Sequence, residues 1–120
     1  MQVLAAVLIA LVAALHLYFL VLEMFLWTTP FGRRTFRTTA EVAESSKTLA
    51  ANQGLYNGFL AAGLAWALIA YGVHAGRPIL TFFLLCVVVA GVYGAATVSR
   101  RILLVQALPA LVAAGFLWLA

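Results

Sequence analysis

Glu23 is the residue best placed to do chemistry, because it is an ionisable side chain within a long run of apolar residues. A carboxyl group inside an apolar helix is costly, and it commonly faces a partner group or a water-filled cavity. Such a group suits a proton carrier, a general acid or base, or a ligand for a cationic group. A structural alternative is a helix-packing salt bridge from Glu23 to Arg100 or Arg101. The sequence leaves both interpretations open.

The densest polar patch is the segment from Asn52 to Asn57. Gln53 and Asn57 are four residues apart and share one helical face, whereas Asn52 and Tyr56 share another. Amides can hold a polar headgroup, a carbonyl or an epoxide oxygen, and a tyrosine hydroxyl can donate a proton to one. This pattern predicts a binding site in which Tyr56 acts chemically. The alternative is that these side chains form hydrogen bonds between helices.

Further polar side chains extend this prediction. His16 precedes Glu23 by seven residues, which places it on nearly the same helical face and about 10 Å away along the axis. There it would relay a proton or bind haem, or else donate a hydrogen bond to a neighbouring helix. The predicted catalytic residues are Glu23 and Tyr56. The predicted substrate-binding residues are His16, Asn52, Gln53, Asn57, Tyr93, Thr97, Arg100 and Gln106.

Several classes of chemistry have no motif here. There is no Cys/His spacing for a zinc site, no phosphate-binding loop and no nucleophile elbow. Cys86, the single cysteine, cannot form an internal disulfide. We therefore predict no metal site and assign no cofactor, with haem at His16 left open.

Four apolar runs supply the elements that must position these residues. They cover about residues 3–27, 51–73, 79–98 and 102–120, and each approaches the ~20 residues that a helix needs to cross a bilayer. The chain is 67% hydrophobic and 8% charged, with a mean hydropathy of +1.14. The runs are continuous rather than alternating, which favours helices over a barrel. The sequence therefore predicts an all-α membrane protein, a single domain over residues 1–120 with an antiparallel bundle of four transmembrane helices.

The connection at residues 28–50 is the longest polar segment. Pro30 and Gly32 are expected to end the first helix in a turn. Thr38-x-x-Glu41 has the form of a capping box, which would start the next helix near Thr39. No proline or glycine follows until Gly54, so helix two should extend from the cytoplasm continuously into the membrane. The second connection, residues 74–78, is expected to be a tight turn.

Two local features bear on how the helices pack. Pro109 lies within the fourth run and should kink it or free a carbonyl near Val105. Small residues at four-residue spacing allow close approach of helix backbones. They are Gly54, Gly58 and Ala62 in the second helix and Gly91 and Ala95 in the third.

The distribution of positive charge predicts the orientation. The first connection holds Arg33, Arg34, Arg37 and Lys47, the third holds Arg100 and Arg101, and the second holds only Arg77. Cytoplasmic loops are enriched in basic residues, so connections one and three should be cytoplasmic and both termini exoplasmic. The polar residues of all four helices then share the cytoplasmic leaflet. The net charge of +4 needs no nucleic acid, and the same residues suit anionic lipid headgroups.

Four stretches carry a resemblance to a known family: residues 22–30, 47–59, 90–97 and 106–109. Through them the chain resembles domain of unknown function 1304, a family of small bacterial four-span proteins. The resemblance implies a multi-pass protein of the bacterial inner membrane and no particular activity. A looser architectural likeness is to the trimeric membrane enzymes of eicosanoid and glutathione metabolism. Their arginine-rich motif in helix two is not reproduced, since residues 50–53 keep only the amides.

Three functional hypotheses follow. The first is binding or transformation of a lipophilic small molecule at the polar site in the cytoplasmic leaflet. The second is a small proton-coupled exporter that uses Glu23, and the third is a non-catalytic membrane subunit. Four short helices enclose little volume, so we also expect a homo-oligomer. The expected partners are thus membrane lipids, a lipophilic ligand and further copies of the chain.

Overall fold

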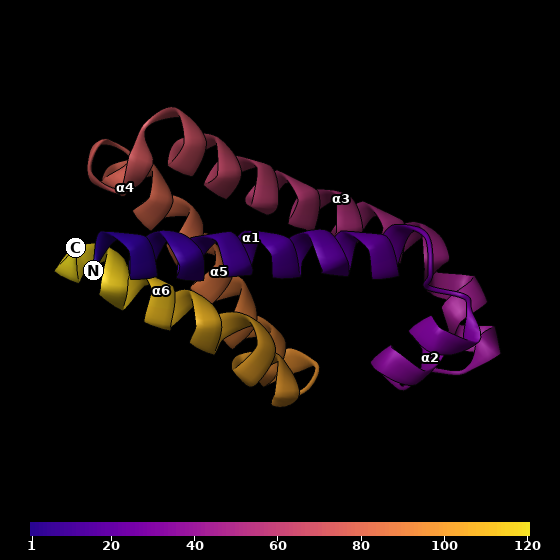
Figure 1. The fold of residues 1–120 in the computed structure, drawn as a ribbon. Helices are drawn as coiled ribbons and strands as arrows, with labels where there is room; N and C mark the ends of the chain where they lie inside the picture. The colour runs from indigo at the N-terminus through magenta and orange to yellow at the C-terminus, as the bar shows by residue number, and fades with distance from the viewer. The chain divides into compact units, whose positions relative to one another are not determined.

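The computed structural model describes all of residues 1–120 and contains helices and no strand (Figure 1). The elements are α1 (Gln2–Met24), α2 (Pro30–Phe36), α3 (Ala40–Ala70), α4 (Gly72–Ala75), α5 (Arg77–Thr97), the π-helical turn η1 (Leu103–Ala107) and α6 (Leu108–Leu119). The predicted all-α class is confirmed. Two helices, α1 and α5, are long and apolar enough to cross a membrane, and Leu103–Leu119 is a shorter apolar helix.

The chain divides into two compact units. Unit 1 comprises Met1–Ala14 and Leu60–Ala120, and unit 2 comprises Leu15–Phe59. Helices α1 and α3 each contribute one part to unit 1 and the other part to unit 2.

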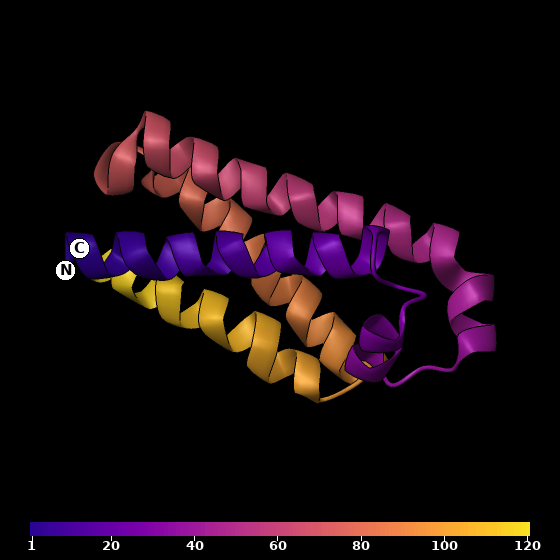
Figure 2. The ribbon, with the colours of Figure 1, turned by 45° about the vertical axis from the view of Figure 1, so that its right-hand side comes forward.

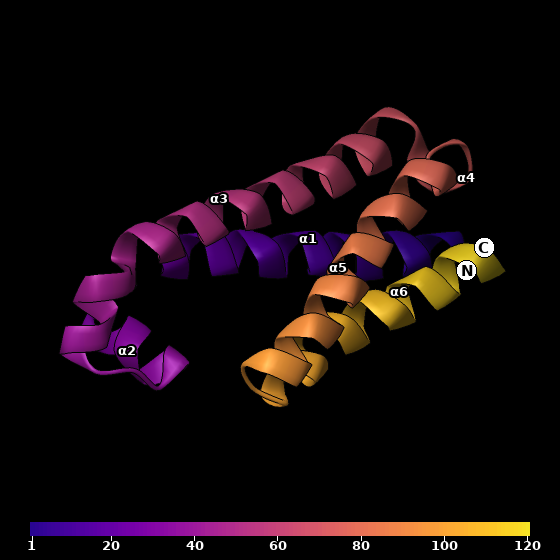
Figure 3. The same ribbon diagram turned by 180° about the vertical axis from the view of Figure 1, so that it is seen from behind.

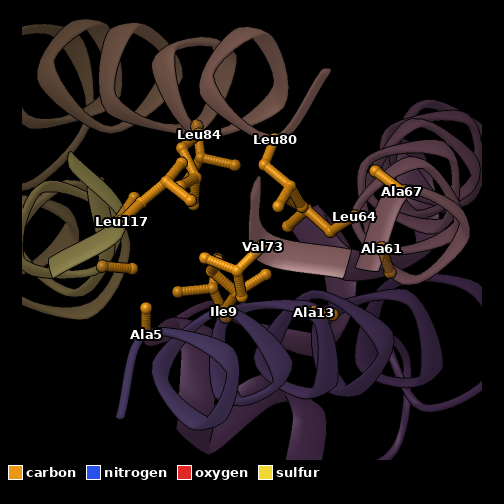
Figure 4. Close-up of a cluster of buried hydrophobic side chains, with 14 residues drawn as sticks. Ala5, Ile9, Ala13, Ala61, Leu64, Ala67, Val73, Leu80, Leu84 and Leu117 are labelled. Carbon is orange, nitrogen blue, oxygen red and sulfur yellow. The ribbon is translucent and has the colours of Figure 1, made fainter. Parts of the chain in front are cut away.

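Unit 1 contains a closely packed apolar core. Ile9, Leu64, Leu80, Leu84 and Leu117 are fully buried. They come from α1, α3, α5 and α6, and Figure 4 shows these side chains converging with several alanines. The alanines add little bulk, so the helix backbones can approach one another closely.

Helices α5 and α6 form an antiparallel pair in unit 1, and the N- and C-termini lie near each other (Figure 3). A Cβ atom added at Gly91 would lie 2.6 Å from the backbone nitrogen of Ala107, so the predicted close approach at Gly91 is confirmed. The irregularity expected near Pro109 takes the form of η1, directly before α6. Proline clashes with the carbonyl four residues earlier, here that of Val105, and a widened turn relieves that clash.

The link between α3 and α5 differs from the prediction of a turn at residues 74–78. Helix α3 ends at Ala70, and Gly72 has a φ of +80°, a conformation that glycine adopts without strain. A single helical turn, α4, follows, and Pro78 lies in the first turn of α5, where its missing N–H is not needed. Gly72 therefore interrupts the helix, and Pro78 helps to begin the next one.

Unit 2 begins with the C-terminal part of α1, which runs beside the first part of α3 (Figures 1 and 2). Helix α1 ends at Met24 rather than at Trp27, so Glu23 lies in its last turn. The prediction that Pro30 and Gly32 end this helix is wrong, because both residues belong to the separate helix α2. Proline is favoured at the first position of a helix, which explains why Pro30 starts α2.

Two contacts fix α2 against the turn that precedes it. Thr29 caps the helix, because its Oγ1 accepts a hydrogen bond from the backbone N–H of Gly32 at 3.2 Å. A Cβ atom on Gly32 would lie 1.9 Å from the carbonyl oxygen of Leu26, so only glycine fits there. The turn at residues 25–29 and helix α2 are thus held together by local contacts, which the sequence did not indicate.

Helix α3 confirms the prediction of one continuous helix from the polar connection into an apolar run. Its 31 residues, at ~1.5 Å per residue, exceed the ~30 Å hydrocarbon thickness of a bilayer. The cap differs by one residue: the Oγ1 of Thr39, not that of Thr38, accepts a hydrogen bond from Val42 N–H at 3.2 Å. A threonine at either position could cap, and the start of the helix at Ala40 selects Thr39.

Candidate functional site

The centre of the candidate site is a carboxylate–amide pair in unit 2. Asn57 is buried, with 5% of its surface exposed, and its Nδ2 donates a hydrogen bond to the Oε1 of Glu23. The pair joins the last turn of α1 to the middle of α3. A buried amide without a partner would be costly, so each group satisfies the other.

Two glycines of α3 allow this approach. A Cβ atom at Gly54 would lie 2.8 Å from Met24 Cγ and 3.2 Å from the carbonyl oxygen of Leu20. A Cβ atom at Gly58 would lie 2.6 Å from Leu20 Cδ1. The predicted role of these small residues is therefore confirmed. The absence of side chains at both positions brings the α3 backbone close enough for the amide to reach the carboxylate.

Glu23 also lines an open pocket of about 340 Å³ in unit 2. Its walls are formed by Glu23, Met24, Phe25, Trp27, Thr28, Lys47, Thr48 and Ala51. Asn57 Nδ2 donates to the Oε1 of Glu23, and the Oε2 of Glu23 accepts no hydrogen bond within the protein. Because Glu23 lines the pocket, its carboxylate is available to a bound group.

A positive charge lies on the same wall. Lys47 Nζ is 2.5 Å from Glu44 Oε1, an ion pair between residues three positions apart on α3. An ammonium has three N–H donors, so this pair leaves Lys47 able to bind another acceptor. The pocket thus combines one acidic and one basic side chain.

Trp27 holds the turn that closes one side of the pocket. Its Nε1 donates to Ser46 Oγ at 3.2 Å, and its ring packs against Phe36 at 4.7 Å between centroids. The indole therefore ties the turn after α1 to both α2 and α3.

His16 is completely buried on α1, and its ring meets that of Phe19 edge-on, with 5.3 Å between centroids. It does not line the pocket. Seven residues separate it from Glu23, or roughly 10 Å along the helix axis. A role as a proton relay or haem ligand stays a prediction.

The other polar residues of α3 point elsewhere. Asn52, Gln53 and Tyr56 are exposed and are not part of the pocket wall. Tyr56 meets the ring of Phe59 edge-on, with 5.9 Å between centroids. Of this predicted group, the structure brings only Asn57 to Glu23. Binding through the other two amides and catalysis by Tyr56 stay predictions.

Four predicted site residues belong to unit 1. Tyr93 is 71% exposed on α5, and Thr97 Oγ1 donates to its backbone carbonyl oxygen at 2.7 Å, a bond within the helix. Arg100 is exposed in the turn after α5, and Gln106 is partly buried in η1. Their roles in binding stay predictions.

Sequence reasoning missed three polar residues of the pocket, namely Thr28, Lys47 and Thr48. A usable signal was present for two of them. In one continuous helix, residues 47 and 48 both neighbour residue 51 on the helix surface, because they precede it by four and three positions. Thr28 lies in the turn between α1 and α2, and the sequence does not reveal that this turn returns toward α3.

These features define an all-helical chain with two helices apolar enough to cross a membrane and a carboxylate–amide pair at the end of one of them. The chain belongs to the family described as protein of unknown function (DUF1304), which matches residues 10–118. It is 32% identical over 108 residues to the uncharacterized protein YpaA of Lactococcus lactis subsp. lactis (strain IL1403). That match covers 88% of this chain and 89% of YpaA. No solved structure matches the chain.

Membership of the family confirms the resemblance that the sequence suggested. Neither description names a substrate, reaction or partner. Any functional conclusion must therefore come from the chemistry of the site.

Proposed function

We propose that this chain is a four-span membrane protein that binds a lipophilic small molecule and holds its polar end at the Glu23 pocket. The observation that carries the proposal is the placement of Glu23. A carboxylate at the end of an apolar helix accepts a hydrogen bond from a buried amide on one oxygen, accepts none on the other, and belongs to a residue that lines an open pocket.

The exposure of large apolar side chains supports a membrane location. Val3, Ile69, Val89 and Leu119 are 77%, 85%, 67% and 67% exposed, and they come from α1, α3, α5 and α6. Exposed apolar surface on this scale requires a cover in a stable protein, and lipid provides one along the whole length of a helix. Helix α3 is long enough to cross but is less apolar than α1 and α5, because the polar segment 52–57 lies within the stretch that would cross.

The size and composition of the pocket support a ligand with a polar end and an apolar remainder. Its volume lies at the lower end of the ~300–1,000 Å³ found for ligand pockets, enough for a polar group but not for long hydrocarbon chains. Phe25 lines the pocket and is 69% exposed, so an apolar tail can continue along this side chain. Cytoplasmic loops are enriched in basic residues, so the basic residues of connection one support a position of the pocket in the cytoplasmic leaflet.

Two further parts of the proposal concern chemistry and assembly. If the bound molecule is reactive, Glu23 is the group that donates or accepts a proton, because it is the carboxylic acid that lines the pocket. The chain would act as a homo-oligomer in the inner membrane of a bacterium, since four short helices enclose little space by themselves.

Mass spectrometry of protein purified in mild detergent tests the proposal. The intact complex gives the stoichiometry, and extraction identifies the bound molecule. We expect one lipophilic species at a fixed ratio to the chain, and about tenfold weaker retention in Glu23→Gln and Asn57→Ala, as loss of a charge-assisted hydrogen bond predicts.

Glu41→Gln is the matched control, because Glu41 is an exposed carboxylate of unit 2 outside the pocket. It should retain the ligand like the wild type. Equal retention by all three variants, with unchanged thermal stability, would show that the pocket is not the binding site. Bulk lipid at variable stoichiometry in the wild type would argue against a specific ligand altogether.

A further inference from the structure

The pocket is lined by one negatively and one positively charged side chain, and together they narrow the class of ligand that it can bind. Glu23 supplies an oxygen that no protein group occupies, and Lys47 supplies an ammonium with free donors. The side chains come from α1 and α3, and both face one volume of about 340 Å³. A ligand with only a positive charge would pair with Glu23 but lie close to the positive charge of Lys47. A ligand with only a negative charge would pair with Lys47 but lie close to the negative charge of Glu23.

Two hydroxyl groups extend the basic side of the pocket. Thr28 and Thr48 line the wall with Lys47, and both residues are exposed and make no hydrogen bond through their hydroxyl groups within the protein. Ammonium and hydroxyl donors together suit an anion with several acceptor oxygens, such as a phosphate. Glu23 offers only an acceptor oxygen when ionised, which suits an ammonium group.

We propose that the ligand of the Glu23 pocket is a zwitterionic bilayer lipid, whose ammonium group binds Glu23 while its phosphate binds Lys47, Thr28 and Thr48. This inference rests on the proposed function and narrows its ligand to one class. The volume agrees with it, because the pocket admits a headgroup while Met24 and exposed Phe25 border the acyl chains. Glu44 does not line the pocket, and its pair with Lys47 leaves the other N–H donors of the ammonium for the phosphate.

The test offers lipids with identical acyl chains and different headgroups to the purified protein. The three lipids are phosphatidylethanolamine, phosphatidylglycerol and a lipid with a trimethylammonium group in place of the phosphate ester. Native mass spectrometry then counts the retained molecules after partial delipidation. We expect the wild type to retain phosphatidylethanolamine about tenfold better than either singly charged lipid, because each charge-assisted hydrogen bond contributes on that order.

The variants separate the two charges. Glu23→Gln should retain phosphatidylethanolamine and phosphatidylglycerol equally, whereas Lys47→Gln should lose the preference for phosphatidylethanolamine over the trimethylammonium lipid. Lys47→Arg should keep the wild-type pattern, because it keeps the charge. Arg34→Gln is the matched control, since it removes an exposed positive charge of unit 2 that does not line the pocket.

The outcomes distinguish this inference from the proposed function. Equal retention of all three lipids by the wild type, with loss of all three in Glu23→Gln, would overturn the zwitterion and leave a lipophile site intact. Retention of none of them would remove the support for both. A water-soluble glycerophosphoethanolamine carries the same two charges, and displacement of the lipid by an equal concentration of it would overturn the assignment to a bilayer lipid.

Discussion

The bond between Asn57 and Glu23 gives the amide a structural role besides its part in binding. Asn57→Leu leaves the carboxylate without its buried donor, so we expect thermal unfolding in detergent to show a loss of about 1 kcal/mol, the order measured for hydrogen bonds between membrane helices. The double variant Glu23→Leu with Asn57→Leu removes both polar groups. Its stability should return to near that of the wild type, because two apolar partners leave nothing unsatisfied.

The same double variant separates folding from ligand binding. It should fail to retain the ligand although it is stable. If the double variant were as unstable as Asn57→Leu, Glu23 and Asn57 would not form one self-contained pair.

At this scale the sequence located Glu23 correctly as a notable residue but left its partner open. Its isolation in an apolar run was visible without a structure. The sequence could not show that the partner of Glu23 is Asn57 and not Arg100 or Arg101. That pairing depends on the short distance between α1 and α3, which Gly54 and Gly58 allow. Asn52 and Gln53 are chemically equivalent to Asn57 in the sequence, and only the helical phase of α3 turns them away from Glu23.

At the scale of the elements, the cost of adding a side chain at a helix-contact glycine depends on whether the facing atoms belong to a backbone or to a flexible side chain. The added Cβ atom of Gly91→Ala would meet the backbone of Ala107, so we expect a loss of about 1–3 kcal/mol from overpacking. Gly58→Ala should cost less, because the atom in its way is the flexible tip of Leu20. Thermal unfolding of each variant in the same detergent measures both effects.

Gly115 provides the matched control. It lies in α6 with no atom within 4 Å of an added Cβ, so Gly115→Ala should be neutral or stabilise the protein by up to ~1 kcal/mol through helix propensity. If Gly91→Ala and Gly115→Ala behaved alike, the α5–η1 contact would not be as close as described.

The elements themselves were predictable to the extent that they follow apolar runs. Helices α1 and α5 end within a few residues of the apolar runs that predicted them. Helix α2 was not predicted, because Pro30 and Gly32 occur both in turns and in first helical turns, and the capping bond of Thr29 decides between them. The break at Gly72 was likewise hidden, since a positive φ leaves no mark on neighbouring residue types.

For the whole molecule, the number of membrane crossings is the property on which the proposed function depends. Two helices, α1 and α5, are long and apolar enough to cross a membrane, and the proposal requires them, α3 and the helix of residues 103–119 all to cross. Positions 75 and 100 discriminate between these arrangements, because two crossings and four crossings place each of them on opposite sides. With four crossings, Ala75 is exoplasmic and Arg100 cytoplasmic, whereas crossings by α1 and α5 alone reverse both.

Cysteine labelling measures this directly, after Cys86→Ser removes the single native thiol. Arg34, Ala75 and Arg100 are exposed, so Arg34→Cys, Ala75→Cys and Arg100→Cys each present a reactive thiol. We expect an impermeant maleimide to label the variant at position 75 in spheroplasts and the other two only after permeabilisation, because basic connections stay in the cytoplasm. Labelling of position 100 from outside, with position 75 protected, would instead establish two crossings. The polar face of α3 would then lie in water, and Glu23 would need a soluble partner rather than a lipid.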